Sequence, residues 1–362
     1  MVETPVRSPL ARATPQARAT IASGAKSLLR FLKSRPILCL LLLTPGIPEY
    51  LSGSSPVNLI VLNPVLFFFQ LGLNLALYGP GVLLVREAMI RWKKGWASVL
   101  FLGAAYGILE EGVALSTLFN PLAGPVGSLG SFGHAAGVNW VWVVGIVPVH
   151  MVFSIALPIL LLGLALPETR GRSLLSRRGI FVAFLVLVVD VAVLAGIILT
   201  LEHFWMGWTT LGFSLLFIGA LVLVAYAASP GLLRAFTPTP RISPLVAGLL
   251  GLASYPAVLL IQNLTIAIGW NPASVILAMI VTNGLLLFVV LRTLGSERNG
   301  PQLIAFSLGL ILPLAVFGLV VGFQVPVILV VDVAMLLFFR KLWRMYPRVS
   351  ETPVPVGALL PA

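Results

Sequence analysis

Long apolar stretches separated by short polar ones most limit what this chain can fold into. A helix needs about 20 mostly apolar residues to cross a bilayer. Ten segments qualify as candidates: 36–52, 64–86, 96–118, 138–166, 179–201, 208–229, 244–268, 272–291, 301–321 and 325–339. With 59% hydrophobic and 9% charged residues, the chain has more apolar surface than one soluble core could bury. The sequence therefore predicts an all-α polytopic transmembrane helical bundle of about ten spans.

The positions of the basic residues test this count independently. All 23 Lys and Arg residues lie before the first span, after the tenth, or in every second connection. Cytoplasmic connections of membrane proteins are enriched in Lys and Arg, so both the N-terminus and the C-terminus are predicted to be cytoplasmic. The net charge of +12 then faces the anionic inner leaflet. We expect a lipid bilayer as the partner of these charges, and no nucleic acid.

The two ends of the chain differ from the middle. Residues 1–35 are basic, contain Ser and Thr, and include one acid, Glu3, which predicts a disordered cytoplasmic tail. A transit peptide has a similar composition, but no apolar run with a small-residue cleavage site follows. Residues 346–362 contain four prolines and predict a second disordered tail, which leaves 36–345 as the integral membrane domain. We expect an integral protein of the cell (plasma) membrane of a bacterium.

A few ionisable side chains remain inside the apolar spans: Glu110, Glu111, His150, Asp190 and Asp332. Ionisable groups at membrane depth are costly, so each is by default a functional hypothesis. At about 1.5 Å per residue, Glu110, Asp190 and His150 lie about 21, 17 and 24 Å from the inner boundary. Spans three and four are consecutive and antiparallel, so we expect Glu110 or Glu111 to face His150.

Glu110 and Glu111 are neighbours on one helix, where successive side chains point about 100° apart. We therefore expect that only one carboxylate takes part in chemistry, while a partner holds the other. A carboxylate beside an imidazole can exchange a proton with it, as a general base and its electrophilic partner must. Four small residues would let a neighbouring helix approach this face: Gly103, Ala104, Gly107 and Ala114.

The other polar positions have simpler interpretations. The pair Arg86 and Glu87 predicts a local ion pair at the inner rim. Glu49, Glu202 and His203 are expected at the solvated outer surface. Packing through hydrogen bonds remains an alternative for the buried acids, above all for Asp190 and Asp332.

Aromatic and turn residues mark the ends of the spans. Trp140 and Trp142 are predicted to anchor span four at the membrane interface. Asn-Pro pairs begin at Asn63, Asn120 and Asn271 and predict helix boundaries. The glycine-rich stretch 119–137 is either a surface loop or a flap that folds back toward the site.

The spacing of the ionisable residues resembles a known family. Adjacent glutamates in one span, a histidine 39 residues later and another 53 residues after that resemble the CPBP family, which contains CAAX-prenyl endopeptidases and bacteriocin-processing relatives. The motifs of these intramembrane proteases are Glu-Glu-x-x-x-Arg, Phe-x-x-x-His and His-x-x-x-Asn. The resemblance implies that Glu110 activates a water, that Glu111 supports it, and that His150 positions the water or stabilises an oxyanion.

The match differs from these motifs at three positions. Leu115, Ile146 and Gly207 stand where the motifs have arginine, phenylalanine and asparagine. His203 would be the histidine of the third motif.

Three further runs, 109–112, 118–121 and Asn139 with the following tryptophan, are similar to a set of uncharacterised bacterial membrane proteins. Four further residues are supporting candidates for the site: Asp190, His203, Asn120 and Asn139.

Three functions remain open at this point. The first is a CPBP-like membrane peptidase that uses a glutamate-activated water. The second is a proton-coupled transporter with a midplane carboxylate and histidine pathway, in which span two, with Gly79, Pro80 and Gly81, forms a broken helix. The third is a non-catalytic membrane scaffold. No cofactor is certain, and a divalent metal stays open although no His-Glu-x-x-His zinc motif occurs.

Overall fold

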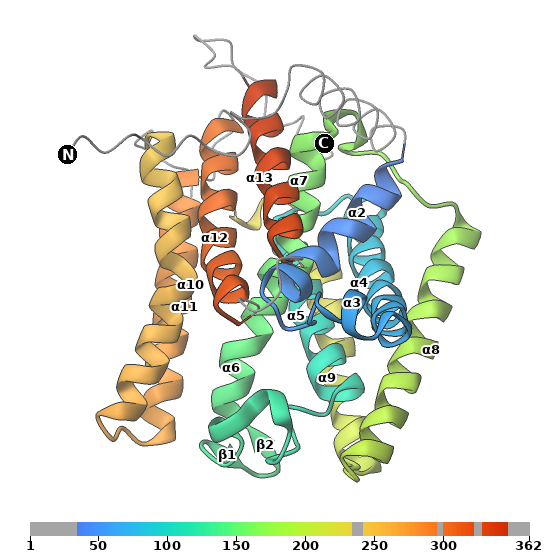
Figure 1. Cartoon of the computed structure of the whole chain (residues 1–362), viewed down its shortest axis with the longest axis vertical. Helices are drawn as coiled ribbons and strands as arrows, with labels where there is room; N and C mark the ends of the chain where they lie inside the picture. The colour runs from blue at the N-terminus through green and yellow to red at the C-terminus, as the bar shows by residue number, and fades with distance from the viewer. Residues whose placement is uncertain (1–34, 234–241, 295–299, 322–327, 347–362) are drawn as a thin grey trace, which may run out of the picture.

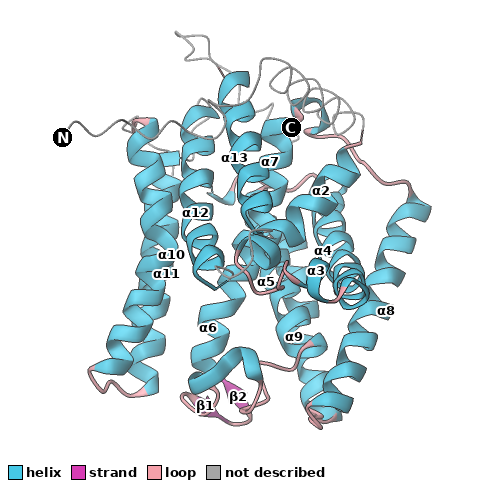
Figure 2. Ribbon diagram, in the orientation of Figure 1, coloured by secondary structure: helices cyan, strands magenta, loops and turns pink. Residues whose placement is uncertain are grey.

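The computed structural model describes residues 35–233, 242–294, 300–321 and 328–346. Within these ranges the chain is a bundle of helices with one very short hairpin (Figures 1 and 2). The predicted all-α polytopic bundle is confirmed. The two predicted tails lie outside the described residues, except for Arg35 and Tyr346.

The first half of the chain supplies the centre of the bundle and includes three π-helical turns. Its helical elements are α2 (Pro36–Pro45), the π-helical turn η2 (Gly46–Leu51), α3 (Leu59–Leu62), α4 (Pro64–Arg91), α5 (Trp96–Ile108), the π-helical turn η3 (Leu109–Ala114), α6 (Trp140–Val149), the π-helical turn η5 (His150–Ala156) and α7 (Leu157–Ala165). The elements α6, η5 and α7 follow one another without a break.

The stretch 119–137 folds into a small cap at the lower end of α6 in Figure 1. It contains the 3₁₀ helix η4 (Gly124–Leu129) and strand β1 (His134–Ala135), which pairs antiparallel with β2 (Val138–Asn139). In this hairpin His134 lies opposite Asn139 and Ala135 opposite Val138. The cap therefore lies at the lower end of the bundle in Figure 1, beside the lower ends of the helices within residues 177–294.

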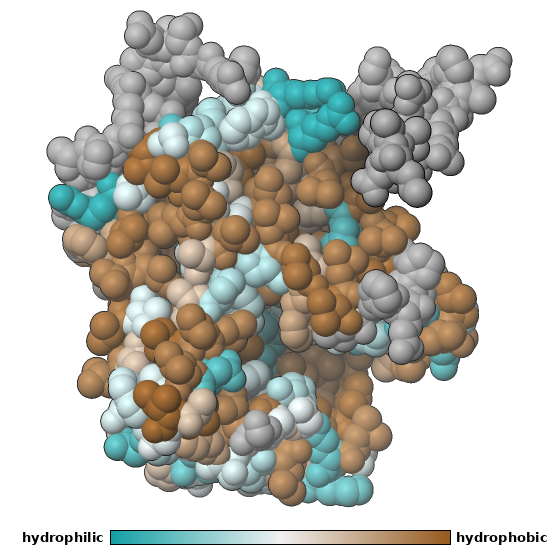
Figure 3. Space-filling model, turned by 60° about the vertical axis from the view of Figure 1, so that its left-hand side comes forward, coloured by the Kyte–Doolittle hydropathy of each residue, from teal (hydrophilic) through white to brown (hydrophobic). Residues whose placement is uncertain are grey.

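The second half of the chain surrounds this centre. Its elements are η6 (Pro167–Thr169), α8 (Arg177–Leu201), α9 (Trp208–Ala227), α10 (Pro244–Ala267), α11 (Pro272–Leu294), α12 (Gly300–Val321) and α13 (Ile328–Met345). Many large apolar side chains on α8 to α11 are exposed, as a lipid-facing surface requires. Figure 3 shows a mostly hydrophobic face with hydrophilic residues gathered toward its two ends.

The Asn-Pro pairs mark helix starts at two of the three predicted positions. The side chain of Asn63 accepts a hydrogen bond from the Leu66 amide at 3.1 Å at the start of α4. Asn271 accepts one from the Ser274 amide at 3.0 Å before α11. These side chains satisfy amides that have no partner in the first turn. Asn120 begins no helix, and its oxygen accepts from the Leu122 amide in a turn.

Eight helices among the described residues are long and apolar enough to cross a membrane. They are Pro64–Arg91, Trp96–Ala114, Trp140–Ala165, Arg177–Leu201, Trp208–Ala227, Pro244–Ala267, Pro272–Leu294 and Gly300–Val320. The other two predicted spans are the shorter apolar helix Pro36–Leu51 and α13, which carries one acid and three basic residues. Helices α7 and α13 end, and α8 and α12 begin, toward the upper end of Figure 1. The basic residues at the start of α8 and near the end of α13 therefore lie at that end, in agreement with the predicted alternation.

Helix α4 is continuous, so the expectation of a broken second span is wrong. Its 28 residues include Gly79, Pro80 and Gly81 without an interruption. A proline inside a transmembrane helix is tolerated because neighbouring helices and local adjustments satisfy the freed backbone groups. The transporter hypothesis thus loses one of its two supporting features.

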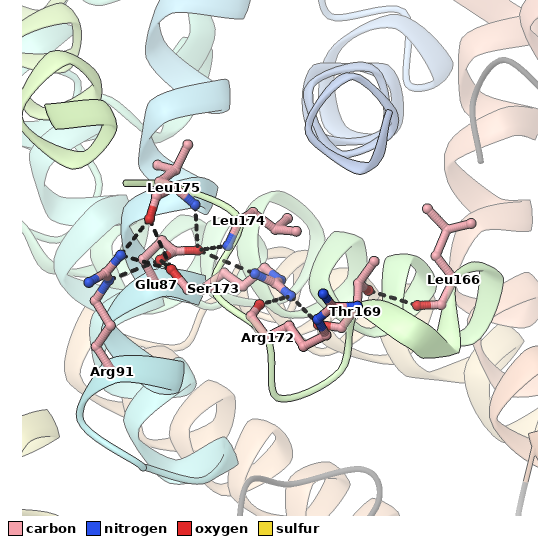
Figure 4. A network of polar contacts seen from close by, with 9 residues as sticks. Glu87, Arg91, Leu166, Thr169, Arg172, Ser173, Leu174 and Leu175 are labelled. Carbon is pink, nitrogen blue, oxygen red and sulfur yellow. Dashed lines mark hydrogen bonds and ion pairs between the residues drawn. The ribbon is translucent and has the colours of Figure 1, made fainter. Parts of the chain in front are cut away.

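A polar network, the Glu87 clamp, joins the end of α4 to the connection between α7 and α8 (Figure 4). It consists of Arg86, Glu87, Arg91, Thr169, Arg172, Ser173, Leu174 and Leu175. The predicted ion pair is present, with Arg86 Nη1 3.4 Å from Glu87 Oε1. The Leu174 amide donates to Glu87 Oε1 at 2.6 Å, and Arg86 Nη2 donates to the Arg172 carbonyl at 3.0 Å. The clamp therefore holds a loop in place, which a local ion pair would not do.

Candidate functional site

Three π-helical turns each carry an ionisable side chain toward one point. Glu49 lies in η2, Glu110 and Glu111 lie in η3, and His150 begins η5. Single π-helical turns inside α-helices are rare and frequently occur at functional sites. Four side chains from three separate helices therefore define a candidate site in the middle of the bundle.

The imidazole of His150 lies between the two neighbouring glutamates. Its Nε2 atom is 2.8 Å from Glu111 Oε1, and its Nδ1 atom is 2.9 Å from Glu110 Oε2. Ser154 Oγ, one turn further along, is 3.1 Å from the same Nδ1. His150 is 4% exposed, and Glu110 and Glu111 are 1% and 6% exposed. The predicted meeting of the glutamates with His150 is thus present in the structure.

Both neighbouring glutamates reach His150, although regular α-helical geometry would direct their side chains about 100° apart. Both carboxylates contact the same ring, one at each nitrogen. The argument from 100° per residue assumed a regular α-helix, whereas Leu109–Ala114 is π-helical. The two nitrogens also point to different sides of the imidazole, so the carboxylates need not converge on one atom.

Both carboxylate oxygens of Glu111 have partners. Its Oε2 accepts a hydrogen bond from the Thr117 hydroxyl and lies 3.4 Å from Trp142 Nε1. Trp142 Nε1 is also 3.2 Å from Thr117 Oγ1. Trp142 was predicted as an interfacial anchor, but its indole N–H points to the buried carboxylate. A carboxylate with partners on both oxygens is held in one orientation.

Glu110 is buried but incompletely bonded. Its contact with His150 is close but is not aligned as a hydrogen bond, which leaves Oε2 without a hydrogen-bond partner among the described residues. The hydroxyl of Tyr106, which is 4% exposed, interacts with this carboxyl electrostatically and has no aligned hydrogen-bond partner in the described part of the chain either. The hydroxyl of Tyr78 lies close to the carboxyl as well. Unsatisfied polar atoms are rare in interiors and require an explanation.

Glu49 belongs to the same site, so its predicted place at the solvated surface is wrong. The Tyr78 hydroxyl donates to Glu49 Oε1 at 2.6 Å, and Ser55 Oγ donates to Oε2 at 2.7 Å. Glu49 also interacts electrostatically with Glu110 and His150. The sequence contained a signal for this role, because Glu49 falls inside the predicted span 36–52.

The four supporting candidates differ in their contacts. Asp190 is 5% exposed, has an oxygen without a hydrogen-bond partner, and interacts electrostatically with Tyr106. His203 is exposed in the turn after α8. Asn120 donates to Glu202 Oε2 at 2.7 Å, which places that acid in a side-chain pair. Asn139 caps α6 by accepting from the Trp142 amide at 2.9 Å.

The site offers ligands for a divalent cation. One ligand atom from each of Glu110, Glu111 and His150 lies within 4.8 Å of the other two. Two carboxylate oxygens with one imidazole nitrogen suit divalent transition metals such as zinc, manganese or iron. The donor set thus fits a metal, although no His-Glu-x-x-His motif is present.

Small residues allow the helices of the site to approach one another, as predicted. A Cβ atom on Gly107 would lie 3.1 Å from His150 Cβ and 3.4 Å from the Val147 carbonyl oxygen. A Cβ atom on Gly81 would lie 2.3 Å from the Tyr106 ring. Glycine at these positions therefore fixes the distance of α5 from η5 and of α4 from Tyr106.

We expect Gly107→Val to destabilise the protein by about 1–3 kcal/mol, since overpacking at a tight contact forces neighbouring groups apart. The thermal unfolding midpoint in detergent measures the effect. Gly219→Val on α9 is the matched control, because nothing lies within 4 Å of a Cβ atom there. Equal midpoints for the two variants would show that α5 and η5 do not pack at Gly107 as described.

A family model described as an uncharacterized membrane protein family matches residues 38–262, which is more than half of the chain. No curated protein and no solved structure matches the chain. The matched residues include every ionisable side chain of the site. The description names a membrane protein and no reaction, so the resemblance to CPBP proteases stays a prediction.

Proposed function

For this chain, which belongs to an uncharacterized membrane protein family, we propose the activity of a CPBP-like intramembrane peptidase that uses a glutamate-activated water. The protein is an integral membrane protein, and we assign it to the bacterial cell membrane. Its proposed substrate is a peptide bond in a membrane-associated segment. The proposal rests on the geometry of Glu110, Glu111 and His150 and not on the family description.

One observation carries the proposal, namely the contrast between the two neighbouring glutamates. Glu111 has partners on both oxygens, while Glu110 has an unsatisfied oxygen at 1% exposure. A group with a structural task is expected to be fully bonded. A general base must instead keep an oxygen available for the proton that it takes.

The reaction would proceed by ordinary acid–base steps. Glu110 removes a proton from water while the resulting hydroxide attacks the carbonyl carbon of the peptide bond. The protonated Glu110 then gives the proton to the leaving nitrogen, so that one water and one amide yield an acid and an amine. General base catalysis of this kind contributes about 10²–10⁴-fold to a rate.

His150 and Tyr106 supply donors beside this base. An imidazole N–H or a tyrosine hydroxyl close to the attacked carbonyl can stabilise the oxygen on which negative charge develops. Glu111, held by Thr117 and Trp142, fixes the ring of His150 through Nε2. Glu111 would therefore position His150 and take no proton from the substrate.

Glu110→Gln tests the proposal in proteoliposomes that contain purified protein and detergent-extracted membrane proteins. Quantification of new amino termini by mass spectrometry reports cleavage. We expect the wild type to generate termini that Glu110→Gln reduces by 10²-fold or more. Asp332→Asn is the control, since Asp332 is another buried membrane acid but lies on α13. Chelation followed by zinc or manganese addition tells whether a metal also takes part.

A set of neighbouring polar groups favours a proton-coupled transporter as the second candidate. Glu49 and Glu110 both interact with Tyr78, and Glu110 and Asp190 both interact electrostatically with Tyr106. Such a row could pass protons laterally through the bundle. An imposed pH gradient would drive a proton flux across the membrane of the same proteoliposomes if the protein is a transporter. Loss of this flux in Asp190→Asn would favour that function. If neither cleavage nor proton flux is detected, and Glu110→Gln is as stable as the wild type, a non-catalytic scaffold is the remaining function.

A further inference from the structure

An apolar groove of about 240 Å³ lies between α2, the end of α7 and α13, away from the glutamates and His150. One wall comes from a single face of α2 and the start of η2, including Cys39, Leu42 and Gly46. The opposite wall is one face of α13, which includes Ala334 and Phe338. Residues three, four or seven apart share a helix face, so both walls run along their helices.

The dimensions of the groove suit a single hydrocarbon chain. It extends along α13 from Val331 to Met345, which corresponds to about 21 Å of helix. An apolar groove that follows one helix face over this length suits an extended chain of CH₂ groups.

Lys341 gives the groove a charge at one end. Among the described residues it is the one charged residue that lines the groove, and it interacts electrostatically with the Cys39 thiol. Lys341 lies one turn before the end of α13, where Arg340 and Arg344 also lie. Basic pockets between helices on the cytoplasmic side bind anionic lipid headgroups. The charge sits where the phosphate of a lipid would be if its chain entered the groove.

We propose that this groove binds one anionic phospholipid of the surrounding bilayer, with an acyl chain between α2 and α13 and its phosphate at Lys341. Lipid tails are as apolar as the groove, so burial of the chain alone does not select a lipid. Selection comes from the headgroup charge, and the groove fixes the position of the chain. This inference is independent of the proposed peptidase activity.

Native mass spectrometry of the purified protein with added phosphatidylglycerol or phosphatidylcholine tests the site. We expect one phosphatidylglycerol to remain bound in preference to phosphatidylcholine, and Lys341→Gln to weaken its binding about fivefold. Arg340→Gln is the matched control, because Arg340 lies on the same helix but does not line the groove. Ala334→Phe fills the groove and is expected to abolish retention, whereas Leu337→Phe, on an exposed face, is not.

Three results would overturn the proposal. The first is equal retention of the two lipids. The second is an equal effect of Lys341→Gln and Arg340→Gln, which would indicate general attraction to the basic end. The third is a dimer that Ala334→Phe dissociates, which would identify a second copy of the chain as the occupant. The thermal midpoint of each variant, measured alongside, identifies any that fails to fold, and for these the smaller substitution Ala334→Leu is used.

Discussion

His150→Ala is expected to destabilise the protein by about 3–5 kcal/mol and to abolish its proposed activity. The ring is the common partner of Glu110 and Glu111, which are 2.9 and 2.8 Å from its two nitrogens. Removal of one member of a buried charged group leaves the others without compensation. Two carboxyl groups would then share a buried space with no imidazole between them. The thermal unfolding midpoint in detergent measures the loss.

The glutamates provide the matched test of this explanation. If two uncompensated acids cause the loss of stability, adding Glu110→Gln and Glu111→Gln to His150→Ala should raise the thermal unfolding midpoint part of the way back to the wild-type value. Residues of one network show coupling of about 0.5–3 kcal/mol in such cycles. His203→Ala is the control for removal of a histidine, since His203 is exposed. A midpoint of His150→Ala equal to that of His203→Ala would show that the ring does not compensate the acids.

The positions of the helices along the chain were predictable because they depend on composition over long segments. Apolar runs and the alternation of Lys and Arg need no knowledge of tertiary contacts. The first and last predicted spans were the exceptions. Segment 36–52 becomes an α-helix followed by a π-helical turn, and α13 carries four charged residues at Asp332 and near its end. Their lengths and charges set them apart from the other eight.

The main residues of the site were predictable because charge inside an apolar span is conspicuous. Glu110, Glu111 and His150 were identified for this reason, and they meet in the structure. The same rule applies to Glu49, which was nevertheless expected at the solvated outer surface. Its contact with Tyr78 places this partly buried acid at the site instead.

The uncharged partners of the site were not predictable. Tyr78, Tyr106, Thr117 and Trp142 are common residue types in spans and at membrane interfaces, and nothing in their sequence positions separates a site residue from a packing residue. Their directions depend on the π-helical turns, which change which residues share a face of the helix. Those turns were not predicted from the sequence.

The second prediction with a large expected effect concerns the Glu87 clamp. Glu87→Ala should release the connection between α7 and α8, because the carboxylate accepts from Arg91 and from the amides of Leu174 and Leu175. Arg86, 3% exposed, would remain buried without its acid, and loss of one partner of a buried ion pair costs about 3–5 kcal/mol. Trypsin digestion in detergent should then cut faster after Arg172, with faster amide exchange at Leu174 and Leu175.

Two variants separate the clamp from a general effect of charge. Glu168→Ala removes an exposed acid from the same connection and should leave trypsin cleavage unchanged. Glu87→Gln keeps an acceptor oxygen for the amides of Leu174 and Leu175 but loses the ion pair with Arg86, so its cleavage rate should be intermediate. Cleavage of Glu87→Ala no faster than that of Glu168→Ala would show that other contacts hold the loop. Since α4 also carries Tyr78, which bonds to Glu49, a released clamp would loosen the helix that lines the site.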